Sequence, residues 1–110
     1  MTDLVNQKCV PCEGGVPPFT PEEVEKYQKE ISSEWTVLEG KRLERKFKFK
    51  DFKEAMGFVN KVAGVSEEEQ HHPDIKIFYS LVTITLWTHA ISGLSENDFI
   101  MAAKIDQIQA

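Results

Sequence analysis

The sequence lacks a long hydrophobic run, since no apolar stretch approaches the roughly 20 residues that a membrane-spanning helix needs. Its beginning also lacks the basic and then apolar segments that are typical of a secretory signal peptide. Positive charge is scarce, because 13 Lys and Arg residues face 18 Asp and Glu residues, for a formal net charge of −5. This balance argues against non-specific nucleic-acid binding, which needs a basic surface. We therefore expect a cytoplasmic protein with neither a membrane nor a nucleic acid as partner.

Cysteine is also rare, and the two residues, Cys9 and Cys12, form a single C-x-x-C motif. A redox-active motif of this type is expected between a strand and a helix, whereas a segment rich in glycine and proline follows here. A zinc site needs two further ligands, which would have to come from the three histidines. Three interpretations stay open: structural or incidental cysteines, metal ligands, or a redox pair.

The rest of the composition is that of a globular domain. Hydrophobic residues make up 41% of the chain and charged residues 28%, and 110 residues suffice for one domain with a buried core. The prolines and glycines between residues 11 and 18 disfavour regular structure. We therefore expect an irregular N-terminal arm over residues 1–19 and a single α+β domain over residues 20–110.

Three segments carry the start signal of a helix, which is a capping residue followed three positions later by an acidic residue. The first also has proline at its first helical position, which favours a helix start, and apolar residues of the second recur at helical spacing. We expect helices over residues 21–31, from 52 to about 70, and from 96 to about 109. The capping pairs are Thr20 with Glu23, Asp51 with Glu54, and Ser95 with Asp98.

Four shorter segments, at residues 35–38, 43–50, 75–79 and 81–89, have the pattern of strands. In the second, apolar and charged residues alternate, with Arg45 as the exception on the apolar face. Its row of lysines is typical of a solvent-exposed sheet face, and nucleic-acid contact is the alternative interpretation. In the fourth, we expect Val82, Ile84 and Leu86 to face the helices. The order α-β-β-α-β-β-α predicts an α+β fold with an antiparallel sheet and helices on one face.

All three histidines lie in two motifs, His71-His72-Pro73 and Trp87-Thr88-His89. Histidine titrates nearest to neutral pH, so this concentration favours proton transfer or metal binding. A hairpin that turns near Ser80 brings the start of one strand beside the end of the other. We therefore expect the three imidazoles to line one pocket. Glu67 lies one helical turn before His71 and is expected to orient or charge-balance it, while Trp87 offers a flat surface to an aromatic ligand.

Each of these motifs also has a purely structural interpretation. His72 is explained by structure as well as by catalysis, and Trp87 by packing or an oligomer contact. Asp98 is explained as the capping partner of Ser95. A zinc site made from the three histidines is a further alternative, although adjacent histidines rarely share one metal ion.

The chain resembles the pterin-4a-carbinolamine dehydratases over nearly its whole length. The cysteine-containing arm and the form of the Trp87-Thr88-His89 motif are similar to the bacterial branch, and Trp87 stands where some animal members have a small residue. The resemblance rests on matching spacing of Glu67, His71-His72-Pro73, Tyr79, Thr88-His89 and the segment 93–98.

The resemblance implies a four-stranded antiparallel sheet with three helices on one face, assembled as a homodimer or homotetramer. It implies dehydration of 4a-hydroxytetrahydropterin to quinonoid dihydropterin and water, which recycles the pterin of an aromatic amino acid hydroxylase. It implies no metal and no organic cofactor.

By the same resemblance, His71 and His89 are expected to act as general base and acid, and His72 to bind and assist. The second hypothesis is a non-catalytic interaction or dimerisation module on the same fold. The third is a metal-binding protein that uses the histidines with Cys9 and Cys12. The residues expected to bind the pterin substrate are Glu67, Pro73, Trp87, Thr88 and Ala90.

Overall fold

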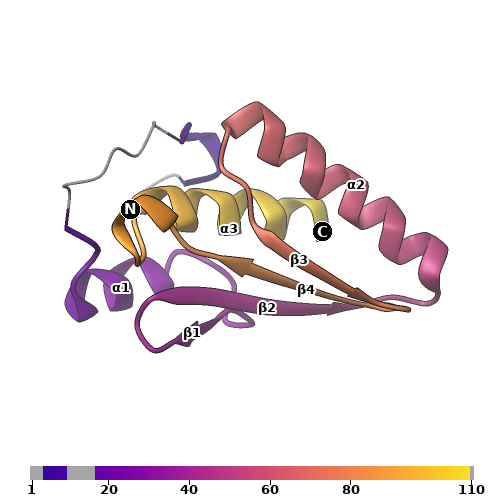
Figure 1. Cartoon of the computed structure of the whole chain (residues 1–110), viewed down its shortest axis with the longest axis horizontal. Helices are drawn as coiled ribbons and strands as arrows, with labels where there is room; N and C mark the ends of the chain where they lie inside the picture. Colours follow the sequence, from indigo (N-terminus) through magenta and orange to yellow (C-terminus); the bar gives the residue numbers. More distant parts are fainter. Residues whose placement is uncertain (1–3, 10–16, 110) are drawn as a thin grey trace.

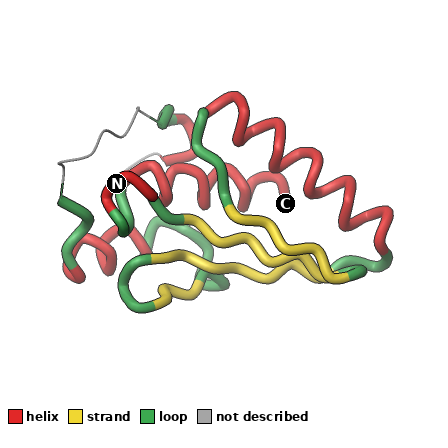
Figure 2. The backbone as a smooth tube through the Cα atoms, in the orientation of Figure 1, coloured by secondary structure: helices red, strands yellow, loops and turns green. Residues whose placement is uncertain are grey.

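The structure, a computed structural model, describes residues 4–9 and 17–109, and Cys12 therefore lies outside the described residues (Figure 1). A sheet forms one layer and helices cover one of its faces (Figure 2). The predicted α+β order and the four-stranded antiparallel sheet are confirmed. The elements are η1 (Leu4–Asn6), α1 (Pro21–Gln28), β1 (Thr36–Leu38), β2 (Arg42–Lys48), α2 (Phe52–Glu69), β3 (Asp74–Phe78), β4 (Leu81–Leu86), η2 (His89–Ile91) and α3 (Glu96–Gln109).

The strands pair in the order β1-β2-β4-β3, and each neighbouring pair is antiparallel. Tyr79 turns the chain between β3 and β4 with a φ of 55°. The register places Asp74 opposite Thr85. The start of β3, which follows the two adjacent histidines, thus lies beside the end of β4, as the hairpin argument predicts.

The core lies between the sheet and the helices. Val82, Ile84 and Leu86 of β4 are fully buried, which confirms their predicted direction. Arg45, the predicted exception on the apolar face of β2, has its Nη1 atom 2.6 Å from Oδ1 of Asp106 in α3. A charged residue is accommodated on this face because a carboxylate of the covering helix meets it.

Two helix ends follow local chemistry. α1 begins with the predicted capping box, in which Thr20 Oγ1 accepts the Glu23 N–H and Glu23 Oε1 accepts the Thr20 N–H. α2 ends at Glu69, because Gln70 adopts a left-handed conformation with a φ of 55°. Residues 71–73 then lead into β3, so the adjacent histidines lie where a helix and a strand meet.

The first described residues pack onto the domain. η1 contacts α3, and Leu4 is buried in the core. The predicted boundary between an arm and a domain at residue 20 stays a prediction. Within residues 4–9 and 17–109, no helix combines the length and the apolar character that crossing a membrane requires.

Candidate active site

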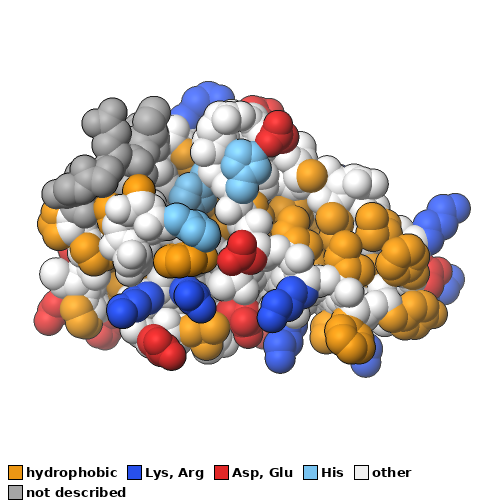
Figure 3. Space-filling view, viewed as in Figure 1, with side chains coloured by type: hydrophobic (Ala, Val, Ile, Leu, Met, Phe, Trp, Pro, Cys, Tyr) orange, Lys and Arg blue, Asp and Glu red, His pale blue; other side chains and the backbone are white. Residues whose placement is uncertain are grey.

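A pocket of about 690 Å³ opens between the end of α2, the start of β3, η2 and the start of α3. Figure 3 shows the three histidines gathered on one part of the surface. Apart from Glu67, each residue that the sequence suggested for the site lines this pocket. These lining residues are His71, His72, Pro73, Trp87, Thr88, His89 and Ala90.

His71 is the most enclosed of the three imidazoles. Its side chain is 12% exposed, and its Nε2 atom lies 2.7 Å from Oδ1 of the fully buried Asp98. A carboxylate oxygen only accepts hydrogen bonds, so we assign the ring proton to Nε2, which leaves a lone pair on Nδ1. Asp98 thereby fixes both the tautomer and the orientation of the ring.

Asp98 is itself held by two groups besides His71. Its Oδ2 atom accepts the Thr88 hydroxyl at 2.8 Å and the Ser95 N–H at 2.9 Å. The Thr88 Oγ1 atom also lies 2.8 Å from Ser95 Oγ. The predicted pairing of Asp98 with Ser95 is therefore present, and the same carboxylate also positions His71. Sequence reasoning missed this second contact, because capping alone accounted for an acidic residue at that position.

His72 lies at the mouth of the pocket, and its Nε2 atom lies 2.5 Å from Oε2 of the exposed Glu67. The prediction that Glu67 orients His71 is wrong about the partner. The left-handed Gln70 ends the helical spacing, so His71 does not follow Glu67 by one regular turn. Since Glu67 is not among the described residues that line the pocket, its proposed contact with substrate stays a prediction.

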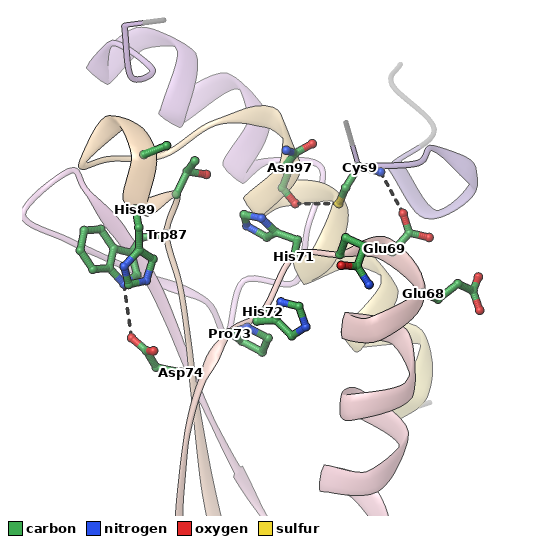
Figure 4. Close-up of a pocket in the computed structure, with 13 residues that line it drawn as sticks. Cys9, Glu68, Glu69, His71, His72, Pro73, Asp74, Trp87, His89 and Asn97 are labelled. Carbon is green, nitrogen blue, oxygen red and sulfur yellow. Dashed lines mark hydrogen bonds between the residues drawn. The ribbon is translucent and has the colours of Figure 1, made fainter. Parts of the chain in front are cut away.

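His89 approaches from the side of the pocket opposite His71 (Figure 4). The sequence placed it at the end of a strand, but β4 ends at Leu86 and His89 is the first residue of η2. The reason is local: Thr88 pairs with Gly93 in an isolated bridge, which turns the chain back. His89 is exposed and lines the mouth of the pocket.

Trp87 forms a flat wall beside His89. The two ring centroids are 3.9 Å apart, and the Arg42 guanidinium lies over the indole at 4.6 Å from its centroid. The indole N–H donates to Asp74 Oδ2 at 3.3 Å. A cation over an aromatic face and a hydrogen bond at the ring edge hold the indole in one orientation.

The structure also brings in lining residues that the sequence did not assign to the site, which are Cys9, Glu68, Glu69, Gln70, Asp74 and Asn97. Burial raises the pKa of the Cys9 thiol from its ordinary 9.0 to about 12, and the charge of Glu69 adds to this. A thiol that keeps its proton is a poor nucleophile and a poor metal ligand. Among the residues described, no group of three or more His, Cys, Asp or Glu side chains is arranged to hold a metal ion.

The fold and the site define a two-layer α+β domain with a ligand pocket that is lined by histidines. The family described as Pterin 4 alpha carbinolamine dehydratase matches residues 17–108. The chain belongs to this family, which confirms the resemblance found in the sequence.

Two bacterial relatives are similar over almost their whole length. A protein of Rickettsia bellii, provisionally named pterin-4-alpha-carbinolamine dehydratase, is 48% identical over 106 residues, which cover 96% of this chain and 94% of the relative. A protein of Alkaliphilus metalliredigens with the same provisional name is 46% identical over 110 residues, which cover 100% of this chain and 99% of the relative.

Two solved structures share the fold. The crystal structure of a transcriptional coactivator/pterin dehydratase from Brucella melitensis is 34% identical, with a TM-score of 0.79, over 84% of this chain and 99% of that chain. A pterin dehydratase-like protein, described as a RuBisCO assembly factor in the alpha-carboxysome, is 26% identical, with a TM-score of 0.59, over 67% of this chain and 87% of that chain.

Proposed function

We propose that the chain dehydrates 4a-hydroxytetrahydropterin to quinonoid dihydropterin and water, as a hydro-lyase that acts through its histidines. The observation that carries the proposal is the convergence of His71, His72 and His89 on one pocket in a member of this family. Dehydration of a carbinolamine removes one proton from the substrate and adds one. Imidazoles do both near neutral pH without extreme tuning of their pKa.

The proposed reaction breaks the bond between carbon 4a and its hydroxyl oxygen. A base removes the proton of the neighbouring ring nitrogen, and the electron pair of that nitrogen forms a carbon–nitrogen double bond. An acid protonates the departing hydroxyl, which leaves as water rather than as hydroxide. The base takes up one proton and the acid gives one, so the two transfers balance. Exchange with solvent then restores the starting protonation state of both groups.

His71 is our candidate for the base. Its Nε2–H is committed to Asp98, so the lone pair on Nδ1 is the one that accepts a proton, and the carboxylate stabilises the imidazolium that forms. His89 is our candidate for the acid, because it is exposed to solvent and lies across the pocket from His71 (Figure 4). His72 is assigned to binding and assistance.

The shape of the pocket supports a flat heterocycle as ligand. Its volume of about 690 Å³ lies within the range of roughly 300–1,000 Å³ that is usual for small-molecule sites. Trp87, with the His89 ring packed against its indole, forms a flat part of the lining, and Pro73 and Ala90 add apolar lining. A pterin that has just left an aromatic amino acid hydroxylase has this shape and carries the hydroxyl that must be lost.

Loss of the 4a-carbinolamine absorbance tests the proposal directly. We expect purified protein to accelerate this loss near neutral pH in proportion to its concentration. The protein with both His71 and His89 replaced by alanine serves as the control for non-specific effects. A rate equal to the uncatalysed rate at every protein concentration would contradict the proposed activity.

A non-catalytic interaction role is the second candidate, and exposed apolar side chains favour it. Phe78 is 82% exposed and Tyr79 is 67% exposed, and hydrophobic side chains gather at this end of the molecule (Figure 3). Apolar patches of this kind mark protein contact sites. Under this hypothesis the wild-type chain should not accelerate dehydration, and Phe78→Ser should weaken its association with a partner protein.

We also infer that the chain forms a homodimer or homotetramer. β1 and β3 are the edges of the sheet, and an edge strand offers backbone groups that are free to pair with another chain. Light scattering at micromolar concentration measures the assembly state, and a monomer there would contradict the inference.

A further inference from the structure

The first described residues reach the pocket, although the family match begins only at residue 17. Cys9 lines the pocket, and Figure 4 shows it beside Asn97 and Glu69, across from Trp87. We propose that residues 4–9, the first described part of the predicted arm and the part meant by the arm from here on, form a wall of the pterin pocket, with Cys9 against the ligand and Glu69 and Lys104 as positioning residues. The proposal rests on the proposed function for the identity of the ligand.

Glu69 anchors the end of the arm. It is the last residue of α2, and its side chain is 2% exposed. Its Oε1 atom accepts the Cys9 N–H at 2.9 Å, and its Oε2 atom lies 3.6 Å from Lys104 Nζ and 3.9 Å from Lys8 Nζ. A carboxylate at a helix C-terminus opposes the helix dipole, and a buried charge needs partners. The Cys9 N–H and the two lysines supply the partners that this buried carboxylate needs, and the same contacts hold the arm in place.

Lys104 of α3 anchors the start of the arm. Its Nζ atom donates to the Val5 carbonyl at 2.8 Å while also facing Glu69. Leu4 is buried in the core next to these contacts. The arm is therefore held at both ends, which is the condition for a rigid wall rather than a loose tail.

Cys9 presents a small neutral surface to the pocket. Its Sγ atom lies 3.7 Å from the Asn97 carbonyl of α3, and the raised pKa of about 12 keeps the thiol protonated near neutral pH. A protonated thiol packs as a small hydrophobe with a weak donor. Glu69 is also separated from His71 by Gln70 alone, so the segment that holds the arm carries the candidate base.

A change of volume at Cys9 tests the wall in the full-length chain. We expect Cys9→Phe to raise the Kd for 7,8-dihydropterin, measured by tryptophan fluorescence, on the order of tenfold, because the larger side chain occupies ligand space. KM should rise in parallel, and kcat should change less. Cys9→Ser is the matched variant of similar size, and its effect should be clearly smaller than that of Cys9→Phe.

Substitution of the anchor tests the positioning role. We expect Glu69→Ala to raise Kd and KM roughly tenfold, with an unchanged circular dichroism spectrum. Glu69→Gln keeps an acceptor for the Cys9 N–H and should restore part of the affinity. Glu25→Ala, which removes an exposed carboxylate of α1, is the control.

The possible outcomes distinguish failure of the wall proposal from failure of the proposed function. The proposal that the arm forms a wall would be overturned if the wild type binds dihydropterin and Cys9→Phe and Glu69→Ala keep its Kd and KM. This holds even if both variants melt at a lower temperature. A wild-type chain that binds no dihydropterin would overturn the proposed function and, with it, pterin as the occupant. Raised Kd in both folded variants supports the proposal.

Discussion

The Nε2 atom of His71 lies 2.7 Å from Oδ1 of Asp98, although 27 positions separate the two residues. One follows the end of α2 and the other lies in the first turn of α3, so the pair joins two helices behind the pocket wall. Because Asp98 also accepts hydrogen bonds from Thr88 and Ser95, His71 has the most constrained setting of the three imidazoles.

Asp98→Asn should lower kcat on the order of 10²- to 10⁴-fold. The carboxylate of Asp98 accepts the Nε2–H of His71, whereas the amide of asparagine can donate an N–H at the same place. The substitution therefore favours the His71 tautomer that has its lone pair on Nε2. KM should change less than kcat, and circular dichroism should show a folded protein. Wild-type kcat in a folded Asp98→Asn variant would remove the imidazole–carboxylate pair from the mechanism.

His71→Ala and His89→Ala should each slow turnover on the order of 10²- to 10⁴-fold, or about 3–5 kcal/mol of barrier. The combined variant should cost less than the product of the two effects, because loss of one group already disables the proton circuit. His72→Ala should mainly weaken binding. Turnover is measured for each variant, and circular dichroism checks that the variant is folded. Full activity in the double variant would contradict the acid–base assignment.

Treatment with EDTA should leave turnover unchanged. Proton transfer by imidazoles suffices for the reaction, since the nitrogen lone pair of the carbinolamine helps to expel the hydroxyl. Elemental analysis of the purified protein accompanies the kinetic assay. Activity that is lost with EDTA and restored by zinc would instead favour the metal-binding alternative.

The Cys9 thiol should make stability depend on pH in the alkaline range. Its pKa is about 12 in the folded chain against an ordinary 9.0. Below pH 9 both states keep the proton, whereas above it the unfolded chain ionises first, so stability falls as the pH rises towards 12. The measurement is the difference in the free energy of unfolding between wild type and Cys9→Ala, from neutral pH to about pH 10. A difference that does not depend on pH would contradict the burial of the thiol.

Asp106→Ala should destabilise the fold and spare the site. Its carboxylate accepts the Trp35 indole N–H at 2.8 Å and the Ser32 N–H at 3.0 Å, in addition to pairing with Arg45. Loss of these bonds leaves a largely buried cation and a buried donor without their partner, at a cost of about 2–4 kcal/mol. Urea unfolding measures the loss, with Glu25→Ala as the surface control. A loss below about 0.5 kcal/mol, the size of an ordinary surface change, would contradict this account.

The helix starts and the burial of β4 were predictable because they depend on neighbours in sequence. Thr20 and Glu23 are three positions apart, and the alternation that buries Ile84 continues along the strand. The meeting of the histidines was predictable from the hairpin. Such features need no knowledge of tertiary structure.

The partners of the site residues were harder to predict. A single left-handed residue, Gln70, decides that Glu67 meets His72 rather than His71, and side-chain periodicity does not reveal such a residue. Asp98 had a sufficient local explanation as a capping residue, so its long-range partner stayed hidden. Cys9 gave no local signal of a pocket, since its contacts lie 60 and 88 positions away.

The anchoring of the arm has a consequence for how the protein is made. The Val5 carbonyl and the Lys104 ammonium lie 99 positions apart in the chain. During translation the arm leaves the ribosome well before Lys104, whose ammonium fixes its start. Contacts of such long sequence separation also carry a loop-closure cost that slows folding. A nascent chain that has not reached residue 104 therefore lacks the contact that fixes the start of the arm, and we expect the arm to settle against the pocket only after Lys104 has emerged.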